Sequence, residues 1–316
     1  MSCAFVFPGQ GSQAVGMGRA LAETFPAARQ VFEEVDDALA QRLSRLIFEG
    51  PESDLTLTEN AQPALMATSL AVARVLEGEG GFILAERAAF VAGHSLGEYS
   101  ALAATGALLL ADTARLLKRR GQAMQQAVPV GAGAMAALLG LDLEAAAAVA
   151  AEAAADTDAV CATANDNAPG QVVVSGARVA VERAIAIAAT RGARRSILLP
   201  VSAPFHCALM APAAVAMKQA LAEVALAPPA VPLVANVTAS AVSDPETIRR
   251  LLVEQVTGMV RWRESVLYMK AQGVATLFEL GAGKVLTGLA RRIDRDLDAV
   301  SVGVPDEIEA ALKRLT

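Results

Sequence analysis

Short apolar runs alternate with segments of helical periodicity along most of the chain, and this order constrains the fold more than any other sequence feature. The runs are AFVF (4–7), AAFVAG (88–93), VPLVANV (231–237), ATLFELG (275–281) and AVSVG (299–303). Strands that alternate with helices form a largely parallel sheet with helices on both faces. Hydrophobic residues make up 54% of the chain and aromatic residues only 4%, so small aliphatic side chains fill the interior, as in such sheets. We therefore predict an α/β fold.

The middle of the chain has a different order of elements. Its pattern predicts strand, helix, strand, strand, helix, strand at AMAALLGL (134–141), LEAAAAVAAEAAA (143–155), AVCATA (159–164), QVVVSG (171–176), VAVERAIAIAATRG (179–192) and SILLPV (196–201). This βαββαβ order is that of a ferredoxin-like unit. We predict a ferredoxin-like subdomain at residues 128–200, inserted into a larger domain made of residues 1–127 and 201–316. A cleft between the two is the expected site.

A G-x-S-x-G motif, Gly93-His94-Ser95-Leu96-Gly97, follows the predicted strand at 88–93 and opens a helix. This is the context of a nucleophile elbow, in which a serine stands on a sharp turn at the top of an α/β-hydrolase sheet. We therefore predict an α/β-hydrolase-like core with Ser95 as nucleophile. The alternative is a serine that only caps the helix.

A serine nucleophile needs a base, and the chain has two histidines. His94 is adjacent to Ser95, and neighbouring side chains diverge, so we expect it to pack under the elbow. His206 lies in a proline-flanked loop after the predicted subdomain and follows the serine in chain order, as in α/β-hydrolases. We predict that His206 is the base, with a purely structural loop histidine as the alternative. Cys207 is expected to be a small packed residue.

The backbone N–H of Leu96, one residue after the nucleophile, is a predicted oxyanion donor. The glycine-rich turn PGQGSQ (8–13) follows the first strand and can supply a second donor. Its spacing also fits a dinucleotide-binding loop, but Pro8 interrupts the strand and no acidic residue follows a second strand about 20 residues on. GAGKVLTG (281–288) lacks the full phosphate-loop pattern and is interpreted as a strand-to-helix turn.

Arg120 falls on an apolar helical stripe with Leu117 and Met124, whereas Lys118 and Arg119 point elsewhere. A partly buried arginine favours an anionic ligand. The alternative is a side chain that extends along the stripe to solvent.

The net charge of −6 argues against a nucleic-acid partner. Three cysteines without metal spacing predict a reducing, cytoplasmic location and no metal site. The start of the chain lacks a signal-peptide pattern, and the charge-free segment 196–217 contains three prolines, so we expect no membrane association. We also expect a monomer.

Several ordered motifs together resemble the malonyl-CoA:acyl-carrier-protein transacylases of type II fatty-acid synthesis. They are FVFPGQGSQ, GHSLGEYSAL, RGQAMQQAVP, GAMAALLGL, NDNAPGQVVVSG, PVSAPFHCALM, VRWRESV and GAGKVLTGL, and they span nearly the whole chain. The resemblance implies that Ser95 is acylated, that His206 is its base, and that Arg120 holds the malonyl carboxylate.

The resemblance also assigns supporting residues. Gln10 and Leu96 would form the oxyanion hole through their N–H groups, and the backbone carbonyl of Gln255 would orient the histidine in place of an acidic residue. Met124 and Phe205 would line the substrate site, and a phenylalanine before the histidine is similar to malonyl-selecting domains. One departure is Gly258-Met259, where family members often have Asn-Pro, and this difference lies in the loop that follows Gln255.

The implied reaction is a ping-pong transfer from malonyl-CoA to the pantetheine thiol of an acyl carrier protein, with no metal or redox cofactor. The alternatives are a malonyl transferase serving malonate decarboxylase or polyketide synthesis, a serine thioesterase or hydrolase, and a non-catalytic carrier-binding module. Acidic carrier proteins are expected to dock on a basic patch, with Arg194, Arg195, Arg291 and Arg292 as candidates.

Overall fold

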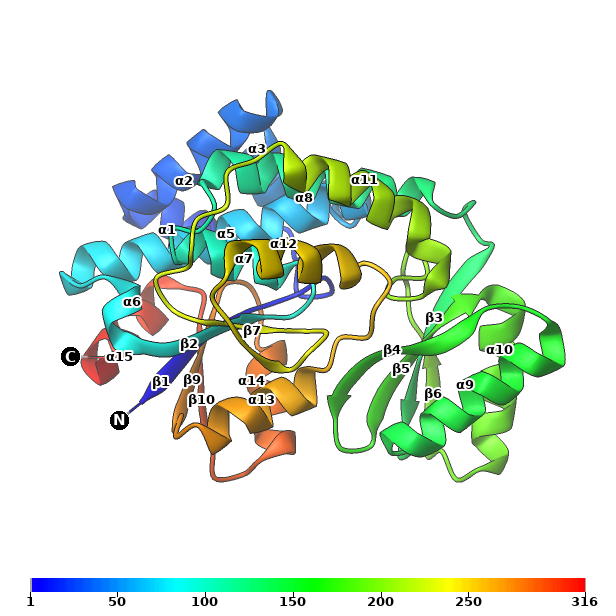
Figure 1. Cartoon of the computed structure of the whole chain (residues 1–316). Coiled ribbons are helices and arrows are strands. Elements are labelled where there is room, and N and C mark those ends of the chain that lie inside the picture. Colours follow the sequence, from blue (N-terminus) through cyan, green and yellow to red (C-terminus); the bar gives the residue numbers. More distant parts are fainter. Residues whose placement is uncertain (1, 316) are drawn as a thin grey trace.

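The computed structural model describes residues 2–315 and contains two sheets (Figure 1). The larger sheet A has the strand order β10-β9-β1-β2-β7-β8, in which β8 runs antiparallel to β7 and the other pairs are parallel. Its strands are β1 (Cys3–Phe7), β2 (Ala88–Gly93), β7 (Leu233–Ala235), β8 (Ser240–Val242), β9 (Thr276–Leu280) and β10 (Asp298–Val302). The five predicted apolar runs all form parallel strands here, which confirms the α/β assignment.

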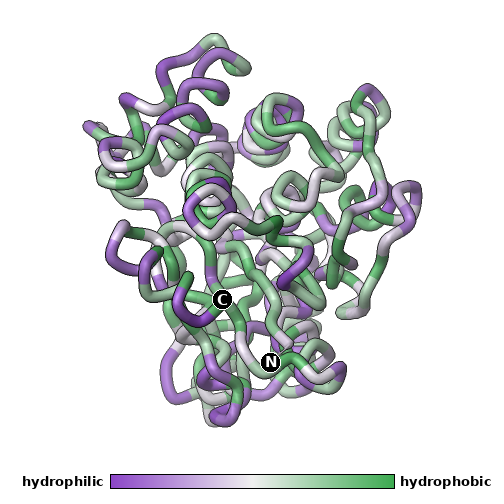
Figure 2. Tube along the Cα trace, turned by 90° about the vertical axis from the view of Figure 1, so that its left-hand side faces the viewer, coloured by the Kyte–Doolittle hydropathy of each residue, from purple (hydrophilic) through white to green (hydrophobic). Residues whose placement is uncertain are grey.

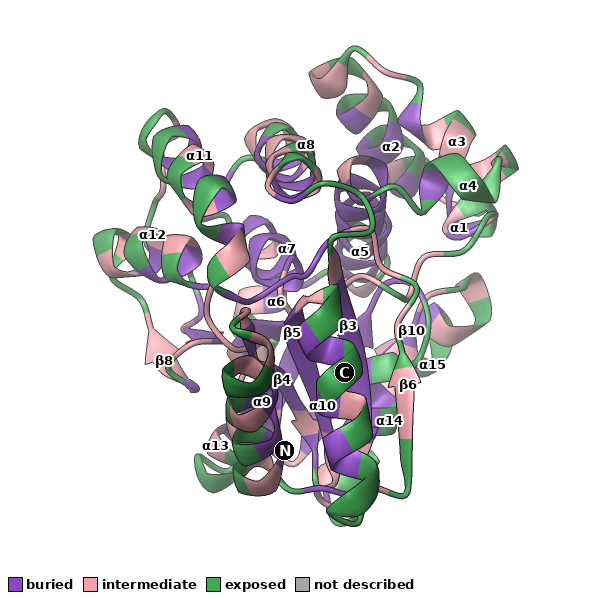
Figure 3. Ribbon diagram, turned by 90° about the vertical axis from the view of Figure 1, so that its right-hand side faces the viewer, coloured by how far each residue is buried: buried purple, intermediate pink, exposed green. Residues whose placement is uncertain are grey.

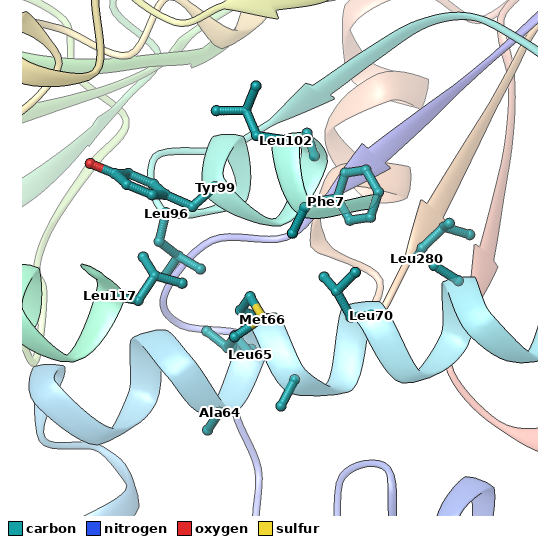
Figure 4. Packing of buried hydrophobic residues seen from close by; sticks show 14 of the residues in the cluster. Phe7, Ala64, Leu65, Met66, Leu70, Leu96, Tyr99, Leu102, Leu117 and Leu280 are labelled. Atoms are coloured by element: carbon teal, nitrogen blue, oxygen red, sulfur yellow. The ribbon is translucent and has the colours of Figure 1, made fainter. Parts of the chain in front are cut away.

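Helices cover both faces of sheet A because both faces of its strands are apolar. In β1, Phe5 and Phe7 face a large core that includes Leu70 of α5 (Thr58–Gly80), whereas Val6 faces a second core. Figure 4 shows Phe7 between Leu70 and the elbow helix α7 (Gly97–Ala104). The second core lies under α13 (Trp262–Ala271) and α14 (Val285–Ile293).

The remaining helices of this part of the molecule are α1 (Arg19–Thr24), α2 (Pro26–Leu39), α3 (Leu43–Glu49), α4 (Glu52–Leu55), α6 (Leu84–Arg87), α8 (Leu110–Gln126), the 3-10 turn η1 (Ala208–Met210), α11 (Ala211–Ala222), α12 (Pro245–Glu254) and α15 (Pro305–Leu315). Most of them pack on α5, whereas α11 packs on α8 and α12 packs on α11. Hydrophobic stretches run through the middle of the molecule and hydrophilic ones gather in the outer turns (Figure 2). No helix within residues 2–315 combines the length and apolar character needed to cross a membrane.

The smaller sheet B is antiparallel, with the order β4-β5-β3-β6. Its elements follow one another along the chain as β3 (Gly133–Leu139), α9 (Leu143–Thr157), β4 (Cys161–Ala168), β5 (Gln171–Ala177), α10 (Arg178–Thr190) and β6 (Arg195–Leu198), which is the order predicted for the middle of the chain. Helices α9 and α10 cover one face (Figure 3), and Met135 and Val173 on the other face join the large core of sheet A.

Helix α1 begins only at Arg19, because Gly16 (φ 92°) and Gly18 (φ 71°) adopt left-handed conformations that interrupt a helix. One predicted boundary was wrong. The strand expected over 231–237 is limited to β7, because Pro232 has no N–H to donate and Asn236 turns away toward the elbow.

Candidate active site

The elbow forms where β2 ends and α7 begins. Ser95 has a φ of 53°, in the left-handed region, and its Oγ is thereby turned out of the helix start. Gly93 and Gly97 make this turn possible, since a Cβ on Gly93 would lie 1.8 Å from the carbonyl carbon of Gly97 and one on Gly97 would lie 2.3 Å from Phe7 O. Because Ser95 Oγ bonds to His206 and not to a helix N–H, the helix-cap alternative is wrong.

His206 lies in the loop after β6 and brings its ring to the elbow. Its Nε2 lies 2.8 Å from Ser95 Oγ, and its Nδ1 lies 2.8 Å from Gln255 O and 3.1 Å from Gly258 O. Two carbonyls can only accept, so Nδ1 carries the proton and Nε2 is free to accept the serine proton. The Gln255 loop therefore contacts His206 even though Gly258-Met259 stands where family members often have Asn-Pro.

The charge state of His206 follows from its surroundings. Burial, reinforced by the Arg120 guanidinium, lowers the pKa of His206 to about 3. The imidazole is therefore neutral at physiological pH, as a proton acceptor must be.

Arg120 is buried, with 1% of its surface exposed, so the alternative of a side chain extending to solvent is wrong. Its Nη1 donates to Gln62 Oε1 at 2.9 Å, and its Nη2 donates to Gln255 Oε1 at 2.8 Å and Ser95 Oγ at 3.1 Å. Its Nε has no hydrogen-bond partner within residues 2–315. The guanidinium thus lies beside the nucleophile, and its hydrogen-bond partners are all uncharged. Its Nε–H remains available to donate to an anion.

The other predicted residues also surround the serine. Leu96 is buried directly after Ser95, and Gln10 donates from Nε2 to Thr58 Oγ1 at 3.2 Å. In the described part of the chain, neither the Gln10 nor the Leu96 backbone N–H donates a hydrogen bond. Met124, one helical turn from Arg120, is buried and accepts from Gln62 Nε2 at 3.6 Å, and Phe205 is buried directly before the histidine.

Three residues that the sequence did not single out hold this site together. Asn236 accepts the Ser95 N–H with Oδ1 at 2.8 Å and donates from Nδ2 to Gly93 O at 2.7 Å, which fixes the elbow. Gln62 holds Arg120, and the buried Glu98 accepts from the side chain of Gln255. Asn236 follows a strand that ends at the same edge of the sheet as β2, which is the signal that could have found it. Glu98 gives no such signal, because an acidic residue in the first turn of a helix is usually exposed.

The structure also places the other residues and segments that the sequence analysis discussed. His94 packs under the elbow, with Nε2 2.8 Å from Asn167 Oδ1 and its ring against Trp262, as predicted. Cys207 is buried and its Sγ lies 3.2 Å from Pro204 O, and the segment 281–284 joins β9 to α14 as a turn. Among residues 2–315, no three His, Cys, Asp or Glu side chains gather in a way that could hold a metal ion.

Sheet B is attached directly to the loop that holds His206. Asn165 in β4 forms a parallel bridge with Val260, and the Asp166 N–H donates to Val260 O at 2.9 Å. The buried Asp166 also pairs with Arg263 at 2.9 Å. The loop from Gln255 to Val260 therefore has a fixed path between the two sheets.

Comparison with known proteins identifies the family of the chain. A family model described as acyl transferase domain matches residues 4–302. The chain is 47% identical over 310 residues to the malonyl CoA-acyl carrier protein transacylase of Escherichia coli K12, covering 98% of each. It is similar to the crystal structure of an acyl-carrier-protein-S-malonyltransferase from Bartonella henselae, with 59% identity, a TM-score of 0.97, and 100% of this chain and 99% of that chain covered.

A second similar structure contains a type II PKS acyl-carrier protein in complex with its malonyl-transacylase, with 42% identity, a TM-score of 0.95, and 99% of this chain and 100% of that chain covered. Family model, relatives and structures all span almost the whole chain. The chain therefore belongs to the acyl transferase family, within which its relatives are malonyl CoA-acyl carrier protein transacylases.

Proposed function

We infer that this chain transfers the malonyl group of malonyl-CoA to the phosphopantetheine thiol of an acyl carrier protein, supplying fatty-acid elongation. The observation that carries this inference is the buried Arg120, whose unpaired Nε and nearby Nη2 lie beside a Ser95–His206 pair. A guanidinium in this position matches the free carboxylate of a malonyl thioester. The names of the relatives and the carrier-protein complex support the same substrates.

The first half-reaction acylates the serine. Ser95 Oγ attacks the thioester carbonyl while its proton moves to His206 Nε2, and the Gln10 and Leu96 N–H groups donate to the oxyanion. The C–S bond then breaks, and His206 returns the proton to the departing coenzyme A thiolate. The product is malonyl-Ser95.

The second half-reaction is the reverse with a new thiol. The carrier thiol gives its proton to His206 and attacks the malonyl ester, and Ser95 leaves as the hydroxyl with that proton. The Gln255 carbonyl keeps Nδ1 protonated throughout, and it takes the place of an acidic residue. The chain's own residues carry out both half-reactions, and we propose that no metal or redox cofactor takes part.

The test is mass spectrometry of the protein after mixing with malonyl-CoA, followed by addition of a carrier protein. We expect a malonyl adduct on Ser95 that disappears when the carrier gains the same mass, and no adduct in Ser95→Ala. Release of free malonate at the same rate without carrier would instead indicate a hydrolase.

Phe205 is proposed to narrow the pocket beside the α-carbon of the acyl group. We expect Phe205→Ser to raise methylmalonyl transfer relative to malonyl transfer by up to about a hundredfold, since one methyl group is worth about 1 to 3 kcal/mol in a pocket. The ratio of kcat/KM for the two thioesters measures this. An unchanged ratio would place the discrimination in other residues.

The carrier is proposed to dock on a basic patch formed by Arg194, Arg195, Arg291 and Arg292. All four are exposed, and none has an ion pair within residues 2–315. Two of the four arginines are linked through sheet B. Arg292 of α14 donates a hydrogen bond to Gln171 in β5, Gln171 pairs with Leu139 in β3, and Leu139 pairs with Arg195 in β6. The patch therefore includes residues from the part of the chain that carries sheet A and from the part that carries sheet B.

Reversing these charges should raise the KM for the carrier several-fold at low salt and less at high salt, because exposed charges act through screened attraction. The KM for malonyl-CoA should stay the same. Equal effects on both substrates would remove these residues from the docking surface.

We also propose the finer fold assignment and its boundaries. Residues 1–127 and 201–316 form an α/β-hydrolase-like domain, supported by the parallel sheet and the elbow after β2. Residues 128–200 form a ferredoxin-like subdomain, supported by the order β4-β5-β3-β6 with both helices on one face. A monomer in the cytoplasm remains our prediction, and three free, buried cysteines fit that compartment.

A further inference from the structure

Glu98 is a buried carboxyl group that the two half-reactions do not use. It lies in the first turn of α7, with 1% of its surface exposed. Its Oε1 accepts the backbone N–H of Asn236, and its Oε2 accepts Nε2–H of Gln255. A carboxylate so fully removed from water is unfavourable unless a positive charge lies close by.

Arg120 supplies that charge through one intervening amide. The Gln255 side chain accepts from Arg120 Nη2 with its Oε1 and donates to Glu98 with its Nε2. Within residues 2–315, no carboxylate lies within 4.0 Å of an Arg120 nitrogen. Glu98 is therefore the buried acidic group of the site that is connected to Arg120, and the side-chain amide of Gln255 forms the connection.

The other titratable groups near Glu98 are neutral. Burial raises the pKa of its neighbour Tyr99 to about 12, lowers the pKa of His206 to about 3, and also lowers the pKa of His94 at the end of β2. From α5, which packs against α7, Glu59 is directed outward and paired with Lys118 of α8. β1 and β7 bring no charged side chain to α7.

Glu98 itself lies near the balance between its two forms. Burial raises its pKa to about 8, opposed by the hydrogen bonds from Asn236 and Gln255 and by the charge of Arg120. The carboxyl is therefore ionised at pH 9 and mainly protonated at pH 7.

A substrate carboxylate that pairs with Arg120 would be a second negative charge in the same buried site as Glu98. Two carboxylates that share one site do not both stay ionised. Building on the function proposed above, we propose that the ionised form of Glu98 is the buried counter-charge of Arg120, and that this form takes up a proton from solvent when a malonyl carboxylate pairs with that arginine. The proton is released again when the malonyl group leaves. Glu98 is thus a positioning residue: it holds the side chain of Gln255, which in turn bonds Arg120, and its ionised form becomes neutral when substrate binds.

The test uses the Ser95→Ala protein, which binds thioesters without being acylated. Isothermal titration calorimetry in buffers of different ionisation enthalpy measures the protons taken up with malonyl-CoA and with acetyl-CoA. Because the two ligands share coenzyme A, their difference isolates the carboxylate. We expect malonyl-CoA to take up close to one proton more than acetyl-CoA at pH 9 and only a small fraction of one at pH 7. The Kd for malonyl-CoA should rise about tenfold between pH 7 and pH 9.

The matched variant is Glu98→Gln in the same background. Its excess proton uptake should vanish, and its Kd for malonyl-CoA should be the same at pH 7 and pH 9. Equal uptake with both thioesters, or excess uptake that persists in Glu98→Gln, overturns the proposal. If the Glu98→Gln variant does not fold, the comparison of proton uptake between malonyl-CoA and acetyl-CoA in Ser95→Ala still tests the proposal. If malonyl-CoA binds no better than acetyl-CoA at pH 7, the proposed function itself is contradicted.

Discussion

Replacing His206 by alanine is expected to lower the rate of Ser95 acylation by malonyl-CoA by about four orders of magnitude or more, because nucleophile and base act as a unit. Ser95 Oγ lies 2.8 Å from His206 Nε2, and the buried site offers the serine proton no comparable acceptor: Arg120, the other group bonded to Oγ, can only donate. Quenched single-turnover reactions analysed by mass spectrometry measure the rate. Ser95→Ala gives the background.

The same experiment tests the alternative histidine. His94 is bonded to Asn167 and turned against Trp262, so it should not replace His206. Acylation of His206→Ala at an undiminished rate would show that the base assignment is wrong and would make His94 the candidate.

The pH dependence of the wild-type reaction gives a second check on the base. A neutral His206 is required, and its pKa is lowered to about 3. The acylation rate should therefore stay level as the pH falls from 7.5 to 5.5, where a histidine with its ordinary pKa near 6.5 would become protonated and inactive. A tenfold loss over that range would contradict the burial argument.

Replacing Arg120 by alanine is expected to remove the preference for malonyl-CoA over acetyl-CoA, which we expect to be a few hundredfold or more in the wild-type protein. The buried guanidinium has only uncharged hydrogen-bond partners and an unpaired Nε. A malonyl carboxylate can pair with it through two parallel hydrogen bonds, whereas an acetyl group leaves it unpaired. Leaving one partner of a buried pair alone costs about 3 to 5 kcal/mol, which sets the expected ratio.

In Arg120→Ala we expect slower malonyl transfer and faster acetyl transfer, and both changes reduce the preference. Ratios of kcat/KM for the two thioesters measure it. Arg120→Lys should recover only part of the preference, because an ammonium group is a point charge without the planar fork.

Arg119→Ala is the matched control for this prediction. Helical geometry turns Arg119 about 100° from its neighbour, and its Nη1 pairs with Glu223 Oε2 at the surface at 3.0 Å. The carboxylate assignment fails if Arg119→Ala changes the selectivity and Arg120→Ala does not.

Local sequence features determined the elements and the reacting groups. The strand at 88–93, the turn with Ser95 and the helix after it are specified by residues next to one another, because the two glycines permit the turn and the apolar run forms the strand. The alternation of elements likewise predicted both sheets, since hydrophobic periodicity reports which side of each element is buried. The scarcity of histidine left two candidates for the base.

The tertiary structure alone decided how those groups are held. Ser95 and His206 are 111 residues apart, and the contact between the Ser95 carbonyl and the Gln255 side chain spans 160 residues. Asn236 and Glu98 acquire their partners only when β7 and α12 are placed beside the elbow, so no local pattern marks them. The sequence by itself determined which residue types can react. Their pairing, protonation and charge balance follow from burial and hydrogen bonds, which exist only once distant segments of the chain exclude water from a common site.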